Sequence, residues 1–237
     1  MAIQHEFCEI LPLSEYALLV RWGNRIDPEL NDAVQALYGT LLAADLPALR
    51  DLVPAYDSLA LVLDPDRFER LFPGADPIQT ARMWVEEAVK LPVSVGAVAG
   101  RTVEIPVCYE AEFAPDLEAL AHCAGMTAAA VVAMHTAQPY RVYLLGFLPG
   151  FAYMGAVDER IAAPRLERPR SSVPAGSVGI AGRQTGIYPL VSPGGWNLIG
   201  RTPLCLFDPQ QPEPTLLRPG DEVRFRAISA EEFHQIR

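Results

Sequence analysis

Glycine, proline, arginine and aromatic residues are concentrated in one stretch of this sequence, from Tyr143 to Asp208. Ten of the 17 glycines lie between Gly146 and Gly200. A flexible linker is rich in glycine and serine and poor in large apolar side chains, whereas this stretch carries rings that can bury surface. These rings include Phe147, Phe151, Tyr153, Tyr188 and Trp196. The stretch is therefore expected to form tight, ordered turns between short strands, with its backbone close to another group.

Size and charge exclude several classes of protein. The chain has 237 residues, half of them hydrophobic, which favours one or two domains with an ordinary core. No run of about 18 apolar residues is present, so no membrane-spanning helix is expected. The N-terminal sequence is acidic where a signal peptide is basic and apolar, which predicts a cytoplasmic location. The net charge of −10 argues against nucleic-acid binding, because such binding needs a basic surface.

Positive charge is nevertheless concentrated in the glycine-rich part of the chain. Between residues 141 and 201 the sequence has seven arginines and only three acidic residues. The arginines are Arg141, Arg160, Arg165, Arg168, Arg170, Arg183 and Arg201. An acidic protein with one arginine-rich segment suggests a small anionic ligand. A genomic preference for arginine is an alternative explanation of the residue type, since Lys90 is the only lysine, but it does not explain the clustering.

The cysteines do not indicate a metal site. Cys8, Cys108, Cys123 and Cys205 show no CxxC spacing, and no pair of histidines completes a ligand set with them. We expect reduced thiols, as in most cytosolic proteins.

The first 90 residues alternate between strand-like and helix-like patterns. The predicted strands are Phe7–Leu11, Ala17–Trp22, Leu52–Tyr56 and Leu59–Leu63, and the predicted helices are Pro28–Ala44 and Ile78–Val89. Asp27 is placed to cap the first helix, and Asp76 begins the second. The order ββαββα predicts a layer of strands covered by a layer of helices. The end of the second helix sets the predicted domain boundary, with domains 1–90 and 91–237.

The remainder of the chain predicts a mostly-β domain. Two short helices are expected at Leu117–Ala124 and Thr127–Thr136. The expected strands are Thr102–Tyr109, Tyr140–Gly146, Ser177–Ala181, Ile187–Val191, Trp196–Ile199, Pro203–Phe207 and Glu222–Phe225. Many short strands with glycine and proline turns favour a barrel or a sandwich.

Several long motifs in this part resemble a known family. They are GFLPGFAY, PRLERPR, VPAGSVGIAG, QTGIYP and SPGGWNLIGRTP, and ALLVRWGNRID and PAYDSLALVLDP fit in the N-terminal part. In this order they resemble the KipI, or allophanate hydrolase subunit 1, family. The resemblance runs from about Leu13 to Phe225, nearly the whole chain.

The resemblance implies a fold and several activities. The fold class would be α+β, with a small N-terminal α/β domain followed by a cyclophilin-like β-barrel. Most stand-alone bacterial members are similar to the B component of the ATP-dependent 5-oxoprolinase, which works with A and C subunits to open 5-oxoproline to L-glutamate. Other members inhibit a sporulation histidine kinase, and fused relatives form the carboxyl-transfer region of urea carboxylase. An enzyme subunit that is inactive alone is the leading hypothesis, and the other two activities are the alternatives.

Lactam opening defines what such a site must contain. The reaction is uphill near neutral pH, so coupling to ATP is reasonable, and one route phosphorylates the carbonyl oxygen. The site then needs guanidinium groups, backbone amides in glycine turns and a carboxamide. The sequence has no GxxxxGK[ST] loop. We therefore expect ATP to bind at a surface shared with a partner, or on the partner itself.

The motif PRLERPR supplies the candidate anion-binding arginines Arg165, Arg168 and Arg170. In an extended chain, Arg168 and Arg170 point to one side and Arg165 to the other. The alternative is an edge strand whose arginines discourage pairing with other strands.

A second candidate region is the polar sequence between two apolar strands, where Gly182, Thr185 and Gly186 are predicted to form a binding turn around Gln184. Gln184 is a candidate catalytic residue, because its side chain can both donate to and accept from a lactam amide, and Tyr188 could form a wall of the pocket. The alternative is a turn whose side chains only satisfy their own backbone.

His135, Gly194 and Gly195 complete the candidate site. His135 is suited to proton transfer near neutral pH, although a histidine at the end of a helix also interacts favourably with the helix dipole. Gly194 and Gly195 follow Pro193 in a predicted turn that would bring backbone to the ligand. Trp196 is expected to be a structural anchor.

Overall fold

The computed structural model describes residues 9–90 and 100–236, and the chain divides into two compact units, Met1–Ala99 and Gly100–Arg237. Each unit has its own hydrophobic core. The predicted domain boundary lies after residue 90. The next nine residues, 91–99, lie outside the described part of the chain. Phe7 and Cys8, at the start of the first predicted strand, also lie outside them.

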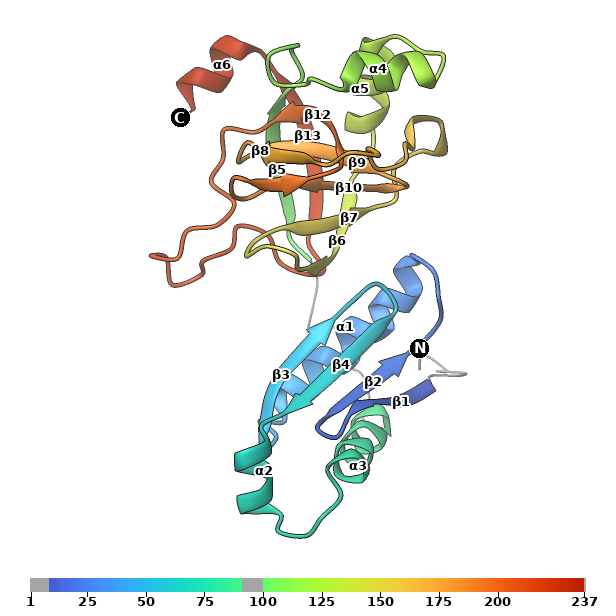
Figure 1. Ribbon diagram of the computed structural model, residues 1–237, viewed down its shortest axis with the longest axis vertical. Coiled ribbons are helices and arrows are strands. Elements are labelled where there is room, and N and C mark those ends of the chain that lie inside the picture. Colours follow the sequence, from blue (N-terminus) through green and yellow to red (C-terminus); the bar gives the residue numbers. More distant parts are fainter. Residues whose placement is uncertain (1–8, 91–99, 237) are drawn as a thin grey trace. The chain divides into compact units, whose positions relative to one another are not determined.

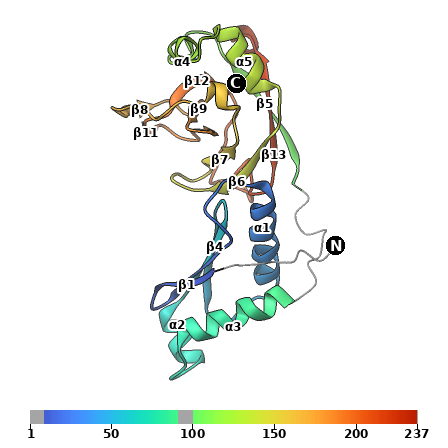
Figure 2. The same ribbon diagram turned by 90° about the vertical axis from the view of Figure 1, so that its right-hand side faces the viewer.

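The first unit is a four-stranded antiparallel sheet with helices α1 and α3 on one face (Figure 2). The order across the sheet is β1-β2-β4-β3. Its elements are β1 (Glu9–Ser14), β2 (Ala17–Arg21), α1 (Pro28–Ala43), β3 (Leu49–Pro54), β4 (Ser58–Leu63), α2 (Pro65–Leu71) and α3 (Pro77–Lys90). Alternate residues of β2 and β4, such as Leu18, Val20, Leu59 and Leu61, are buried in the core.

Aspartate side chains begin the helices of this unit. Asp27 accepts a hydrogen bond from the Glu29 amide at 2.9 Å, and Asp76 accepts one from the Ile78 amide at 2.8 Å. Both helix starts agree with the sequence prediction. Helix α2, capped by Asp64, was not predicted because seven residues are too few to show a helical period. The order is therefore ββαββαα rather than ββαββα.

The second unit is a closed seven-stranded β-barrel with two helices, α4 and α5, at one end (Figure 1). The strand order around the barrel is β10-β7-β6-β13-β5-β12-β9, and β13 is parallel to β5 while the other barrel pairs are antiparallel. Its elements are β5 (Thr102–Cys108), α4 (Leu117–Cys123), α5 (Ala128–Thr136), β6 (Tyr140–Leu145), β7 (Ala152–Gly155), η1 (Glu159–Ile161), β8 (Arg170–Val173), β9 (Ser177–Ala181), β10 (Gln184–Ile187), β11 (Ser192–Gly194), β12 (Asn197–Arg201), β13 (Glu222–Ile228) and α6 (Ala230–Gln235). Strands β8 and β11 form a separate two-stranded sheet.

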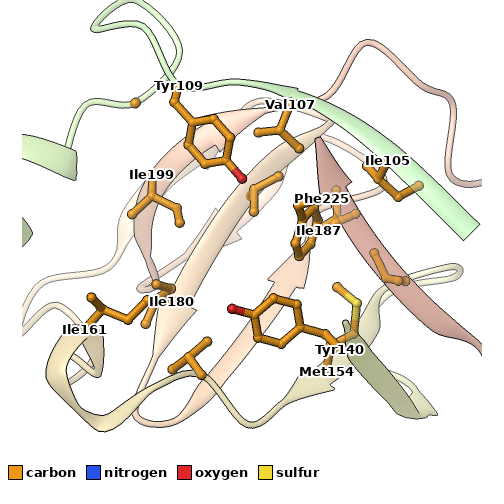
Figure 3. Close-up of a cluster of buried hydrophobic side chains, with 14 of the residues drawn as sticks. Ile105, Val107, Tyr109, Tyr140, Met154, Ile161, Ile180, Ile187, Ile199 and Phe225 are labelled. Atoms are coloured by element: carbon orange, nitrogen blue, oxygen red, sulfur yellow. The ribbon is translucent and has the colours of Figure 1, made fainter. Parts of the chain in front are cut away.

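The barrel is filled by apolar side chains. Ile105, Val107 and Ile180 are fully buried there. Tyr109 and Tyr140 enter the same core with their hydroxyl groups directed inward (Figure 3). The Tyr109 hydroxyl is hydrogen-bonded to His135, so the barrel interior contains polar groups as well as apolar ones.

The predicted α+β class with a barrel domain is confirmed, because the seven strands close into a ring. Two strand predictions were wrong. The strand expected at Ile187–Val191 begins earlier, as β10, and the stretch Pro203–Phe207 contains only an isolated bridge from Phe207 to Thr215.

Among the residues that the structure describes, no single helix combines the length and the apolar character needed to span a membrane. Helices α4 and α5 are long and apolar enough only when they are counted together, and the chain bends by 95° between them.

Candidate functional site

A pocket of about 250 Å³ in the second unit is formed by the loop between β6 and β7, the segment before β8, and strand β11. It is lined by Phe147, Phe151, Tyr153, Arg165, Leu166, Pro169, Tyr188, Pro193, Gly194, Gly195 and Trp196. All of these residues belong to the glycine-rich stretch, which therefore does form one concave surface.

Aromatic rings form most of the pocket wall. The ring centroid of Phe151 lies 4.8 Å from that of Tyr153, 5.2 Å from that of Tyr188 and 5.4 Å from that of Trp196. Phe147 lies 5.6 Å from Phe151 with an interplanar angle of 88°. All four pairs are edge-to-face, an arrangement that aromatic rings favour. The wall is therefore a packed apolar surface suited to the carbon atoms of a small ring.

Glycines allow these rings to pack so closely. A Cβ atom on Gly194 would lie 2.4 Å from the hydroxyl oxygen of Tyr188. A Cβ atom on Gly186 would lie 3.1 Å from both the Phe151 and the Trp196 rings. Gly186 lies within β10, next to the Phe151 and Trp196 rings, and does not line the pocket, whereas Gly194 does. The predicted close approach is thus to other parts of the protein itself: an aromatic side chain at Gly194, and the Ala152 carbonyl oxygen, at 2.9 Å, together with two rings at Gly186.

Arg165 brings positive charge to the pocket. Its side chain is exposed and makes no hydrogen bond or ion pair with another residue in the described part of the chain. Burial raises the pKa of Tyr153 and of Tyr188, and the charge of Arg165 partly offsets both shifts. Both phenols are therefore protonated near neutral pH. An unpaired guanidinium beside two phenols suits a ligand with one carboxylate.

The other two candidate arginines have different roles. Arg170 forms an ion pair with Asp116, with Nη2 2.6 Å from Oδ1, and the second Asp116 oxygen accepts a hydrogen bond from the Leu198 amide at 2.7 Å. Only 30% of the Arg170 side chain and 14% of the Asp116 side chain are exposed. Asp116 precedes α4, so its two carboxylate oxygens connect Arg170 of β8 and Leu198 of β12 to the start of that helix, while the buried Nη1 atom of Arg170 has no hydrogen-bond partner among the described residues. Arg168 is exposed and does not line the pocket.

The prediction of a binding turn at 182–186 was wrong about the backbone. Gly182, with φ 58°, lies in the two-residue link between β9 and β10, and Gln184 already begins β10. Gln184 pairs with Ala181 on one side and Gly155 on the other. Neither Gly182 nor Gln184 lines the pocket, and no described contact connects Gln184 to it.

His135 lies inside the barrel with 0% of its surface exposed. Its Nδ1 atom is 2.8 Å from the Tyr109 hydroxyl oxygen, and its Nε2 atom is 3.0 Å from the Thr185 hydroxyl oxygen. The Thr185 hydroxyl donates its hydrogen to the Gly179 carbonyl at 3.1 Å. It therefore accepts a hydrogen bond from Nε2–H, and Nδ1 accepts one from Tyr109. Tyr109, His135, Thr185 and the Gly179 carbonyl therefore form one hydrogen-bonded chain in the barrel core, which does not include the buried Tyr140 hydroxyl.

This arrangement gives His135 and Thr185 a structural role. Burial lowers the pKa of His135 to about 3, so the ring is neutral near pH 7. Both ring nitrogens are used by buried hydroxyl groups, and the side chain does not line the pocket. The predicted acid–base role of His135 and the predicted binding role of Thr185 receive no support from this geometry. Their contacts instead stabilise the barrel interior.

We expect the stability of the chain to fall as pH is lowered from 6.5 towards 3. In that window the unfolded histidine takes up a proton while the buried ring of His135 stays neutral, so acid favours the unfolded state. One such proton contributes up to about 1.4 kcal/mol per pH unit to the free energy of unfolding. Guanidinium unfolding across this window should show a shallower pH dependence for His135→Gln than for the wild type. Equal slopes would show that His135 titrates normally in the folded chain.

A larger hollow, of about 420 Å³, lies beside α5 and β13. Its lining is mainly apolar, and Glu110 is its only charged residue. It does not fit an anionic ligand, so the smaller aromatic pocket is the better candidate site. Among residues 9–90 and 100–236, no three His, Cys, Asp or Glu side chains are grouped as metal ligands.

The sequence matches the family described as carboxyltransferase domain, subdomain C and D, over residues 8–217. The chain therefore belongs to this carboxyltransferase-domain family, and the resemblance inferred from the motifs is confirmed. It is 43% identical over 228 residues to the B component of 5-oxoprolinase from Bacillus subtilis (strain 168), covering 95% of each chain.

Solved structures share the fold. The crystal structure of TTHA0988 matches with a TM-score of 0.78 and 42% identity over 90% of this chain, which spans 40% of that longer protein. The urea carboxylase of Kluyveromyces lactis matches with a TM-score of 0.70 over 97% of this chain and 22% of that one. At 17% identity, this second match shows a likeness of fold alone.

Proposed function

We propose that this chain is the B component of a 5-oxoprolinase, which opens 5-oxoproline to L-glutamate. The identity of 43% over 95% of both chains to a protein of that name supports this assignment. Because a subunit works with other chains, we propose that this one acts with A and C subunits and is inactive alone. The cytoplasmic location remains a prediction.

The chemistry of 5-oxoproline fits the aromatic pocket. This compound has a five-membered ring with apolar carbons, a neutral lactam amide and one carboxylate. Arg165 would bind the carboxylate through charge-assisted hydrogen bonds, Phe151 and Trp196 would contact the ring carbons, and the Tyr188 phenol would be near the amide. The observation that carries this assignment is the unpaired, exposed Arg165 at an aromatic pocket of about 250 Å³.

The reaction consumes water and breaks one C–N bond. The oxygen of water joins the lactam carbonyl carbon, the ring C–N bond breaks, and the nitrogen takes up a proton to become the amine of glutamate. We propose that hydrolysis of ATP to ADP and phosphate drives this step. Arg165 is the only charged side chain among the described pocket residues, which suits one carboxylate better than a triphosphate. ATP is therefore proposed to bind on a partner protein or at a shared surface, while this chain binds and orients the lactam.

Reconstitution tests the proposal. The chain mixed with its A and C partners, ATP and 5-oxoproline should release L-glutamate, and omission of this chain should stop the release. A coupled assay for glutamate measures it. A complete mixture that stays inert, while the chain suppresses autophosphorylation of a sensor histidine kinase, would replace the enzyme assignment with the kinase-inhibitor alternative.

A further inference from the structure

Phe147 has an unusual backbone conformation for a phenylalanine. Its φ is 69°, in the left-handed region that favours glycine. The Leu148 amide donates a hydrogen bond to the Gly146 carbonyl at 2.8 Å, so Phe147 is the central residue of a three-residue γ-turn. A γ-turn with positive φ is the rarer and more strained of the two forms. Such strain persists only where the surrounding structure holds it, and it is found preferentially at functional sites.

The loop around Phe147 is held by its own backbone. The Gly146 amide donates to the Phe151 carbonyl at 3.1 Å, and the Phe151 amide donates to the Leu148 carbonyl at 3.0 Å. These bonds close the loop between β6 and β7. The γ-turn is therefore part of a defined loop structure, and the position of the Phe147 side chain is set by that loop.

The Phe147 ring is exposed although it is large and apolar. Its residue surface is 61% exposed, so burial in the core does not account for it. The ring meets Phe151 at 5.6 Å and Tyr188 at 6.5 Å, with interplanar angles of 88° in both cases. It also lines the pocket that contains Arg165. The strained turn thus holds an exposed ring at the edge of an aromatic pocket.

The charges of the pocket lining bear on which nitrogen atoms a ligand could carry. None of the described lining residues is acidic. The ammonium group of an open-chain amino acid would therefore lose water without gaining a carboxylate partner, which is costly. The lactam nitrogen of a cyclic acid is neutral and avoids that cost. The lining therefore favours a ring-shaped monocarboxylate over an open-chain amino acid.

We propose that Phe147 is a specificity-determining residue that covers a small ring-shaped carboxylate in this pocket and favours the cyclic lactam over the open-chain product. The choice of 5-oxoproline as the ligand rests on the proposed function, whereas the class of ligand rests on the pocket alone. Removal of the ring should weaken binding of a cyclic acid while leaving the weak binding of an open-chain amino acid nearly unchanged.

Calorimetric titration of the full-length chain, alone and assembled with its partners, tests this proposal with 5-oxoproline, L-glutamate and benzoate as probes. Phe147→Ala should weaken 5-oxoproline binding by about three- to tenfold, because it removes an aromatic contact. Val191→Ala is the matched control, since Val191 is also apolar and exposed (68%) but does not line the pocket. The indole N–H signal of Trp196, the only tryptophan after residue 84, should shift on binding and locate the ligand.

Thermal unfolding separates a covering role from a structural one. Phe147→Gly should unfold at the same temperature as Phe147→Ala or higher, because glycine adopts φ 69° without strain, and both should bind the lactam weakly. A ring needed for folding would lower the unfolding temperature in both variants.

The outcomes also distinguish this proposal from the proposed function. Binding of benzoate but not 5-oxoproline, weakened by Phe147→Ala, would support the covering role and contradict the 5-oxoprolinase assignment. Binding of neither probe to the chain or its complex, or equal binding to the wild type and Phe147→Ala, would overturn the proposal.

Discussion

Arg165→Ala is expected to lower kcat/KM for 5-oxoproline by about 10- to 100-fold in the reconstituted complex, because a hydrogen bond to a charged group contributes about 1.5–3 kcal/mol. Arg165 is the charged residue that lines the aromatic pocket, and no described residue pairs with it. Most of the loss should be an increase in KM, since the carboxylate is bound before and during the reaction alike. Initial rates of glutamate release over a range of 5-oxoproline concentrations measure both constants.

Arg168→Ala is the control for this prediction. Arg168 lies three residues further along the same motif and is also exposed, but it does not line the pocket. It should keep kcat/KM within about twofold, because surface substitutions away from special features have small effects. Similar losses in both variants would indicate a general effect of charge, and no loss in Arg165→Ala would exclude Arg165 from substrate binding.

Gly194→Ala should damage both the stability and the activity of the protein. The new methyl group would lie 2.4 Å from the hydroxyl oxygen of Tyr188, whose residue surface is 1% exposed, so the ring must move. Overpacking of this kind costs about 1–3 kcal/mol of folding free energy. Movement of Tyr188 would also disturb its contact with Phe151, and we expect kcat/KM to fall at least about tenfold as the pocket changes shape. Denaturant unfolding and steady-state kinetics measure the two effects.

Gly195→Ala provides the comparison for stability. The nearest atom to a Cβ at Gly195 is 3.5 Å away, on Pro169, which is an ordinary contact distance. Its folding free energy should stay within about 0.5 kcal/mol of the wild type. If Gly194→Ala is as stable and active as the wild type, the close packing of the pocket wall is not required.

The sequence predicted the elements whose signals are local. Asp27 and Asp76 mark helix starts because a cap needs only a side-chain oxygen next to the first turn. Strands such as Ser177–Ala181 were predicted from short apolar runs between turns. Closure of the barrel could not be predicted in this way, because it depends on β10 meeting both β7 and β9 and on the parallel pairing of β13 with β5, which lies more than 100 residues earlier.

The site was predicted only in part for a similar reason. The arginines of PRLERPR look equivalent in sequence, yet Arg170 pairs with Asp116, which is 54 residues away, and only Arg165 lines the pocket. The sequence could not show that the Nε2 atom of His135 is hydrogen-bonded to Thr185, which lies 50 residues further along the chain. Tyr188, Gly194 and Gly195, which were predicted to bind substrate or phosphate, do line the pocket, and their binding role stays a prediction.

The aromatic wall of the pocket was missed as part of the site. Phe147, Phe151 and Tyr153 were recognised only as rings able to bury surface, and Trp196 only as an anchor. The sequence did carry one indication of this wall, since three aromatic residues lie within the eight residues of GFLPGFAY. The strained γ-turn at Phe147 had no such signal, because its positive φ occurs at a phenylalanine and not at a glycine.

A crystal structure of the assembled complex with 5-oxoproline would test directly whether one arginine and a wall of aromatic rings bind a cyclic carboxylate. We predict the carboxylate about 2.7–2.9 Å from the Arg165 guanidinium, the usual distance for such a pair, with the lactam ring against Phe151 and beneath Phe147. Ordered 5-oxoproline at another position, with Arg165 making no contact to it, would contradict the account.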